Sequence, residues 1–223
     1  GPTFGSGHDL LSFTNNGRNA GGYYQLNGYM TISHGYDFKG IQVNQINTDL
    51  NLADSVTTMS GKLQQAHKKQ LEAWIGTGPK DFQLLYSISQ NNGYNSQTFH
   101  QQCDNQGPTV TVLYNAHNSV FGGYTSVNWS QTNNYLVDDK AFLFQLLYNG
   151  ANQYNKFPVK DTTYSVYCAS SYGPTFGGGH DLLSFTGNGG NAGDEYMYYQ
   201  LNGSMVNHSY DSKGIQVNQI NNG

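Results

Sequence analysis

Three residues capable of nucleophilic or acid–base chemistry stand close together at His100, Cys103 and Asp104. A helix would place His100 and Cys103 on one face, and a histidine beside a cysteine can generate a nucleophilic thiolate. Catalysis also needs a group that orients the histidine and donors that stabilise an oxyanion, and the sequence assigns neither. The pattern therefore favours a structural role, and we predict no catalytic residues.

Glycine-rich segments that end in His-Asp occur twice, at Gly177–Asp181 and at Gly5–Asp9. Such loops can hold phosphate, but a P-loop continues with Lys and Ser or Thr, and a dinucleotide site needs a strand, a helix and a spaced acidic residue. Neither pattern follows these glycines. We expect the glycines to permit positive φ angles and close packing, and we expect His180 and Asp181 to bond buried backbone groups.

Residues suited to metal binding are sparse. The seven histidines and two cysteines show no zinc-ligand spacing. Two acidic pairs, Asp138–Asp139 and Asp194–Glu195, could contribute to a calcium site, but a calcium loop needs a regular series of oxygen ligands. The sequence therefore favours no metal and no cofactor, with calcium as the one remaining candidate.

The two cysteines, Cys103 and Cys168, are open to two interpretations. They are either two buried thiols or, in a secreted protein, the partners of one disulfide. The separation of their Cα atoms decides between these alternatives, and a sequence does not supply that distance.

The glycine-rich motif belongs to a longer repeated segment. Gly1-Pro-Thr-Phe4 returns at Gly173, Tyr23-Tyr-Gln-Leu-Asn-Gly28 returns at Tyr198, and Gly40-Ile-Gln-Val-Asn-Gln-Ile-Asn47 returns unchanged at Gly214. The last residues of the chain thus repeat the first ones at a spacing of about one domain, which predicts a partial second copy of one folding unit.

Low charge is the main feature of the composition. Charged residues make up 11% of the chain, the net charge is −4, and glutamate occurs only at Glu72 and Glu195. Typical globular proteins carry about 25% charged residues. The few Lys and Arg residues exclude a basic face for nucleic acid, and no stretch approaches the roughly 18 apolar residues of a membrane span. The composition favours an extracellular protein that associates with other chains.

One amphipathic helix is predicted from Asp54 or Ser55 to Gly76, because apolar residues recur every three or four positions. Its basic run, 67–69, is expected on the solvated face. A second, short helix is predicted over Ser96–Cys103, with Phe99 facing inward.

The other predicted elements are strands, which cover residues 41–46, 82–88, 109–114, 120–129, 141–148, 157–159 and 164–168. The strand over 41–46 is predicted to have one buried face, and the apolar run 141–148 is predicted to be central. Gly122 and Gly123 indicate a backbone or ring that packs closely. Many short strands with few helices predict a mainly β fold, a two-sheet β sandwich.

Five motifs in these elements resemble the TLDc domain, a family that includes the oxidation-resistance proteins and the amino-terminal part of interferon-induced proteins. In the order of the family, they are Phe99–Val112, Phe121–Trp129, Ala141–Phe144, Lys156–Val159 and Tyr172–Leu182. The resemblance covers about residues 58–221 and implies a β sandwich flanked by short helices. Family members are not established hydrolases, and some bind and regulate the proton-pumping V-ATPase. A partner-binding module of that kind is therefore an alternative function for this chain.

The resemblance also divides the chain into three parts. Residues 58–223 are predicted to be a complete TLDc domain, 49–57 a linker, and 1–48 the carboxyl-terminal half of a preceding TLDc repeat. Alone, that half would expose strand edges, so we expect an upstream repeat or a neighbouring copy to complete it. Docking of this kind resembles donor-strand complementation, and head-to-tail contacts form open filaments.

We therefore expect a non-enzymatic structural protein whose tandem TLDc modules bind copies of the chain head to tail. The product would be an extracellular fibre or matrix, such as a byssus-like thread. An enzyme that uses Cys103 or His180 is the third hypothesis.

Tyrosine suits protein contacts because it buries a large area at low entropic cost. The candidate residues for packing or assembly are Gly1, Pro2, Thr3, Phe4, His8, Asp9, Tyr23, Tyr24, His180, Asp181, Tyr198 and Tyr199. Glycosylation sequons, relevant if the protein is secreted, stand at Asn128, Asn202 and Asn207.

Overall fold

The structure, a computed structural model, is mainly β and describes residues 3–4, 10–11, 40–47, 63–87, 95–114, 117–187, 208–216 and 218–221. Its first elements are β1 (Thr3–Phe4), β2 (Leu10–Leu11), β3 (Gly40–Asn47), α1 (Gln65–Ile75), β4 (Asp81–Ser87), α2 (Ser96–Cys103), β5 (Thr109–Tyr114) and β6 (Val120–Thr125). The remaining elements are β7 (Asn134–Leu136), β8 (Phe142–Tyr148), β9 (Ala151–Pro158), a 3-10 turn (Thr162–Tyr164), β10 (Val166–Cys168), β11 (Thr175–Phe176), β12 (Leu182–Leu183) and α3 (Asn218–Asn221).

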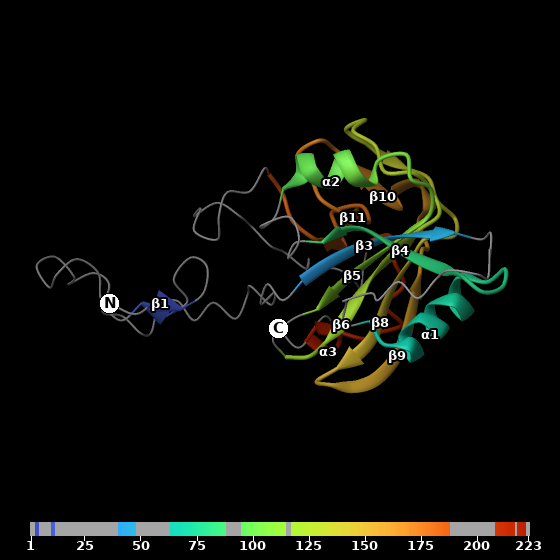
Figure 1. Cartoon of the computed structure of the whole chain (residues 1–223), viewed down its shortest axis with the longest axis vertical. Coiled ribbons are helices and arrows are strands. Elements are labelled where there is room, and N and C mark those ends of the chain that lie inside the picture. The colour runs from blue at the N-terminus through green and yellow to red at the C-terminus, as the bar shows by residue number, and fades with distance from the viewer. Residues whose placement is uncertain are drawn as a thin grey trace, which may run out of the picture.

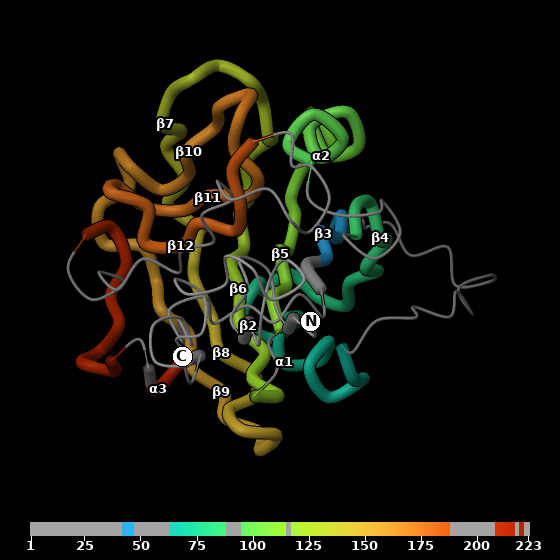
Figure 2. Tube along the Cα trace, turned by 90° about the vertical axis from the view of Figure 1, so that its left-hand side faces the viewer, coloured from blue at the N-terminus to red at the C-terminus, as the bar shows by residue number. Residues whose placement is uncertain are grey.

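Two antiparallel sheets form the body of the protein, as the sandwich prediction requires. The larger sheet has six strands in the order β4-β3-β5-β6-β8-β9. The smaller has four, in the order β12-β11-β10-β7. Figure 1 shows β3, in blue, between β4 and β5, and Figure 2 shows the smaller sheet beside the larger one. A separate two-stranded ladder joins β1 to β2.

The main core lies between the two sheets. Val43, Leu113 and Leu143 from the larger sheet pack there with Val166 and Phe176 from the smaller one. Aromatic rings fill much of this space, including Tyr86, Phe99, Trp129, Phe157, Phe185 and Tyr210. Burial of large apolar area on both inner faces is the main source of stability in such a sandwich.

A second core forms where α1 covers the outer face of the larger sheet. Leu71 packs in this cluster with Phe82 and Val110, and Trp74 contacts the ring of Phe142 edge-on at a centroid distance of 6.2 Å. The predicted helix end at Gly76 is confirmed, while the helix begins at Gln65. The cap candidates Asp54 and Ser55 lie outside the described residues.

The prediction that His67 lies on a solvated helix face is wrong. His67 is fully buried, and its Nε2 lies 3.3 Å from the Asn152 side-chain oxygen on β9. The helical period puts His67 one turn before Leu71, on the side that meets the sheet. Burial lowers the pKa of the His67 imidazole.

The predicted helix α2 is confirmed over Ser96–Cys103. Asn95 caps its start, because the Asn95 side-chain oxygen accepts a hydrogen bond from the Thr98 backbone N–H at 2.8 Å. Phe99 points into the main core and is fully buried. The helix thus closes one side of the space between the sheets (Figure 1).

The glycine pair in β6 packs closely on both sides, as predicted. A side chain at Gly122 would overlap the Thr111 carbonyl, and one at Gly123 would overlap the ring of Phe176. Strand β8 is interior, between β6 and β9, and most of it is buried, which confirms the prediction for residues 141–148. Several strand bounds differ from the prediction. Strand β6 ends at Thr125, β9 is longer than the predicted 157–159, and β10 begins at Val166 because Tyr164 lies in the 3-10 turn.

Candidate functional site

Strand β3 lies inside a sheet whose other strands all come from residues beyond position 80. It pairs with β4 over Gln42–Asn47 and with β5 over Gly40–Gln45. We call the space between β4 and β5 the β3 position. Removing its occupant would leave two facing rows of unpaired backbone groups, so the sheet needs a strand there.

The side chains of β3 reach both faces of the sheet. Val43 is fully buried in the core between the sheets, and Ile46 is buried in the cluster under α1. The prediction of a strand is confirmed, but the prediction of one buried face is wrong. Helix α1 covers one face of β3 and the smaller sheet covers the other, so both faces are buried.

Two amides of β3 are buried without all of their hydrogen bonds. Both side-chain polar atoms of Asn44, and Oε1 of Gln42, find no partner among the described residues. Thr111, opposite Val43 on β5, has an unpartnered buried hydroxyl as well. An unsatisfied buried polar group costs about 1–3 kcal/mol. Strand β3 is therefore held in place by its backbone pairing, by the buried Val43 and Ile46, and by the hydrogen bond from Gln45 Nε2 to the Gln106 carbonyl at 2.6 Å.

The copy of the β3 sequence at residues 214–221 has a different structure. None of its described residues, 214–216 and 218–221, lies in a strand. Residues Asn218–Asn221 instead form the short helix α3, which lies against β6 and β8. One octapeptide thus has two structures in one chain.

A buried glutamine holds α3 in place. Gln145 on β8 donates hydrogen bonds from Nε2 to the carbonyls of Gln219 at 2.8 Å and Ile220 at 2.9 Å. Its Oε1 accepts a hydrogen bond from the Asn155 side chain at 2.7 Å. Ile220 is fully buried in the core between the sheets. Sequence reasoning missed Gln145, although it is the single polar residue within the apolar run 141–148.

The residues just before this copy are firmly attached to the fold. Tyr210 is fully buried, and its hydroxyl donates to the Ser165 carbonyl at 2.6 Å. The Asp211 backbone N–H donates to the carbonyl of Pro158, the last residue of β9, at 2.9 Å. The chain therefore approaches the second copy from the β9 edge of the larger sheet.

The Gly-Pro-Thr-Phe motif, in contrast, forms the same ladder in both of its copies. Thr3 and Phe4 pair with Leu11 and Leu10, and Thr175 and Phe176 pair with Leu183 and Leu182. The register is the same in the two copies. This motif carries its own local structure, whereas the octapeptide does not.

The second glycine-rich loop is structural, as expected. Gly177 and Gly179 have φ angles of +86° and +74°, and a side chain at Gly177 would overlap the Asp181 carboxyl. Asp181 is fully buried, and its Oδ2 accepts the Ser209 backbone N–H at 2.8 Å, which confirms the predicted bond to buried backbone. Burial raises the pKa of Asp181 to about 6, although the hydrogen bond from Ser209 opposes this rise.

His180 belongs to an aromatic cluster that sequence reasoning did not identify. Its ring lies 5.2 Å from the ring of Tyr167 and 5.3 Å from that of Tyr172. Tyr135 contacts Tyr167 at 4.8 Å and Tyr164 at 5.0 Å. These residues come from four separate segments of the chain, so only the fold brings them together.

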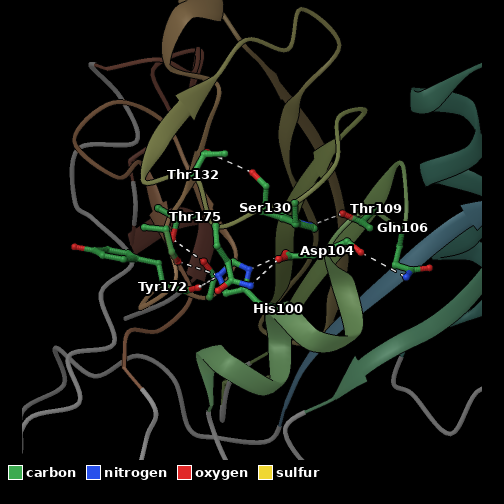
Figure 3. A network of polar contacts seen from close by, with 12 residues as sticks. His100, Asp104, Gln106, Thr109, Ser130, Thr132, Tyr172 and Thr175 are labelled. Carbon is green, nitrogen blue, oxygen red and sulfur yellow. Dashed lines mark hydrogen bonds and ion pairs between the residues drawn. The ribbon is translucent and has the colours of Figure 1, made fainter.

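The candidate nucleophilic group ties α2 to the turn before β11 (Figure 3). His100 Nδ1 lies 2.7 Å from Asp104 Oδ1, and Nε2 lies 2.9 Å from the Ala169 carbonyl and 3.1 Å from the Tyr172 carbonyl. Both ring nitrogens therefore face oxygen acceptors. Cys103 is fully buried, and burial raises the pKa of its thiol far above the ordinary value. The geometry orients the histidine towards backbone, and a thiol of this kind is not a reactive one.

The candidate disulfide partners are free thiols in the described part of the chain. Cys103 and Cys168 are both buried in the core between the sheets. Burial raises the pKa of Cys168 to about 11. Both cysteines thus act as small apolar side chains in this structure.

The candidate calcium ligand Asp138 is buried and already bonded. Its carboxylate accepts hydrogen bonds from the Thr125 hydroxyl at 2.8 Å, and from the Ser126 backbone N–H and hydroxyl, each at 2.6 Å. It also accepts the Lys140 N–H at 3.1 Å. Asp139 beside it is exposed. The described residues contain no cluster of three or more candidate metal ligands.

Asn128 is exposed, and its side-chain oxygen accepts the Gly107 backbone N–H at 2.7 Å. The other predicted residues lie outside the described part of the chain; they are Gly1, Pro2, His8, Asp9, Tyr23, Tyr24, Asp194, Glu195, Tyr198, Tyr199, Asn202 and Asn207.

Comparison with known proteins gives one family. A family model described as the TLDc domain matches residues 57–219. No curated protein matches the chain. No described helix is long and apolar enough to cross a membrane. The family match begins after β3 and extends into the second copy of the octapeptide, so one strand of the larger sheet comes from outside the matched region.

Proposed function

The chain belongs to the TLDc domain family, and from this premise we propose that it is a non-enzymatic structural protein whose TLDc units join head to tail. The product is an extracellular fibre or matrix. The chain supplies a family unit and, ahead of it, a segment that repeats the end of that unit. The repeated segment of one chain can therefore contact the family unit of another. Such head-to-tail contacts between two different surfaces form open filaments.

One observation carries the proposal. A strand from the preceding partial repeat, β3, is built into the larger sheet of the family unit. This placement supports the proposal that residues from the end of one repeat complete the fold of the next. Main-chain hydrogen bonds along both edges of β3 supply the affinity of this strand for the sheet, as in strand addition between chains. A strand bound in this way can carry polar side chains.

The chemistry of the described residues supports a structural role. The His100 nitrogens bond the Asp104 carboxylate and backbone carbonyls, Cys103 is a buried thiol of raised pKa, and Asp181 bonds the Ser209 backbone. His100 and Asp181 thus join separate segments of the fold, and Cys103 packs in the core. Low charge reduces repulsion between copies of the chain and favours their association.

Electron microscopy of the natively purified protein, with its denatured mass determined in parallel, tests the proposal. We expect filaments with an axial repeat of about one domain. Single compact particles of 24.6 kDa at all concentrations would contradict it. Such particles, together with recovery of V-ATPase subunits in a pull-down, would support the alternative, a partner-binding module.

Glycosylation tests the extracellular part of the proposal. Asn128 lies in an exposed sequon and can accept a glycan in a secreted protein. We expect peptide-N-glycosidase to lower the mass of the natively purified protein, and Asn128→Gln to remove part of that change. A native protein of unmodified mass that is recovered only from cytosol would contradict secretion.

A further inference from the structure

We propose that Gly214–Asn221 is a second donor strand, which fills the β3 position of another copy of this chain. The inference rests on the proposed head-to-tail assembly and names the contact that would make it. The acceptor is the space between β4 and β5, and the donor is the octapeptide whose last four residues form α3.

The donor can reproduce every contact that β3 makes, because the two octapeptides are identical. Val217 would take the buried place of Val43, and Ile220 that of Ile46. The backbone pairing with β4 and β5 is available in the same register. The octapeptide also carries no charged residue, so no repulsion opposes its transfer.

The octapeptide is suited to exist outside a sheet as well as inside one. Only three of its eight residues are large and apolar, namely those at positions 2, 4 and 7. Within the sheet, Gln42 and Asn44 leave polar atoms without partners among the described residues. A strand adapted only to permanent central burial would carry apolar residues there. Among the described residues of the second copy, Gly214, Gln216 and Gln219 are exposed. Ile220 and the Gln145 bonds attach α3, and the partly buried Ile215 also packs against the core.

Geometry favours a second copy over the same chain as the acceptor. Asp211 is bonded to the end of β9, and the β3 position lies four strand spacings from β9, or about 19 Å across the sheet. The three residues from Asp211 to Gly214 span at most about 11 Å. While Tyr210 and Asp211 stay attached, the octapeptide does not reach the β3 position of its own chain.

Disulfide trapping in the full chain tests this contact. Gln45 lies directly opposite the exposed Gln83 on β4, and Gln219 is the equivalent of Gln45 in the second copy. Cysteines at directly opposed antiparallel positions lie within disulfide range. An acceptor chain with Gln42→Pro and Gln83→Cys is mixed with a donor chain of different mass that carries Gln219→Cys. The proline disables β3 of the acceptor, because it removes a donor from the middle of a sheet.

We expect a covalent dimer of one acceptor and one donor on a non-reducing gel. The matched control is a donor that carries both Gln216→Pro and Gln219→Cys. Gln216 is exposed, and among the described residues its N–H donates to the Gln219 side chain. The proline therefore disturbs α3 little but prevents strand pairing. This donor should give at least about tenfold less mixed dimer, since proline excludes it from a central strand position. Cys103 and Cys168 compete poorly because they are buried thiols of raised pKa.

A positive control and a second condition keep the test decisive. A single chain with Gln45→Cys and Gln83→Cys should cross-link within itself, which verifies that this register forms a disulfide. If the acceptor with Gln42→Pro does not fold, the mixture is repeated without that substitution in sub-denaturing urea. Transient release of β3 then allows the donor to be trapped.

Three results would overturn the inference. The first is an equal yield of mixed dimer from the donors with and without Gln216→Pro. The second is a chain with Gln42→Pro, Gln83→Cys and Gln219→Cys that cross-links only within itself, which would mean that the octapeptide fills its own β3 position. The third is filaments of the unsubstituted protein without trapping at 83 and 219, which would refute this contact and leave the proposed assembly standing. Trapping without filaments would support this contact and contradict the proposed assembly.

Discussion

The segments Gly40–Asn47 and Gly214–Asn221 have the same eight residues and different structures. The first is a central strand, and the second contains a short helix bound by Gln145. The two copies of Gly-Pro-Thr-Phe, at Gly1 and Gly173, share one ladder register instead. The Gly-Pro-Thr-Phe segment therefore has a structure that its local sequence specifies, whereas the structure of the octapeptide depends on the elements that surround it.

The physical reason lies in the range of the contacts. In each Gly-Pro-Thr-Phe ladder the paired residues lie fewer than about ten positions apart, so the pairing of its two short strands is local. The octapeptide has no internal partner for a strand and needs β4 and β5, which come from residues 81–87 and 109–114. Secondary structure in such a segment follows the tertiary surroundings, because strand propensity depends on them.

Proline at matched positions gives the largest expected effect. Gln42→Pro should lower the free energy of unfolding by about 3 kcal/mol or more, because it breaks a central ladder, whereas exposed Gln216→Pro should cost less than about 1 kcal/mol. Urea unfolding followed by circular dichroism measures both values. Equal losses in the two variants would contradict the assignment of two different structures.

Truncation of the matched isoleucines is expected to have the next largest effect. Ile46 and Ile220 are both buried, one under α1 and one between the sheets. Ile46→Ala and Ile220→Ala should each cost about 2–4 kcal/mol, since each leaves a cavity. Thermal unfolding of the two variants provides the comparison. A loss at Ile46 with no loss at Ile220 would mean that α3 does not bury its side chain in solution.

The pH dependence of stability probes the second glycine-rich loop. Burial raises the Asp181 pKa to about 6, above its ordinary value of 3.8, so the folded protein binds this proton more tightly than the unfolded chain does. The contribution of Asp181 to stability therefore decreases as the pH rises from about 4 to 6 and stays low above that range.

Asp181→Asn should abolish this decrease. The difference in unfolding free energy between the original chain and the variant, measured by urea unfolding at pH 4, 5, 6 and 7, should fall with rising pH and then level off. Taking the difference cancels the opposite dependence of His67 and His180, whose pKa values burial lowers. A difference that is constant with pH would contradict the raised pKa.

The smallest expected effect is a gain of stability at Asn44. Both polar atoms of this side chain are buried without a partner among the described residues, and Val110 lies opposite it. Asn44→Val should raise the free energy of unfolding by about 1 kcal/mol, because it removes the cost of the unpaired amide and favours a strand. A lower melting temperature would show that the amide is bonded. If the gain is found, β3 of the same variant should be replaced more slowly by the octapeptide of another copy.

Several features of the fold were predictable from local signals. Apolar spacing located α1 and its end at Gly76, the helix over Ser96–Cys103 was predicted with Phe99 facing inward, and the glycine pair Gly122–Gly123 indicated close packing. The five TLDc motifs predicted the sandwich. Each of these signals depends on residues near one another in sequence or on a pattern that one element contains by itself.

The candidate site required the tertiary structure. The burial of His67 depends on which side of α1 meets the sheet, and the aromatic cluster of Tyr135, Tyr167 and His180 joins separate segments. The role of Gln145 depends on the position of α3. A sequence pattern does not contain these distances, because they arise from packing between elements.

The residues alone are enough to identify a TLDc unit and two identical octapeptides. Which octapeptide completes the larger sheet depends on contacts between elements of the fold. Two identical segments have the same intrinsic preferences, so nothing within them can distinguish a strand from a helix. The distinction comes from the edges of β4 and β5 that pair with β3 on one side, and from Gln145 and the attached Tyr210 on the other.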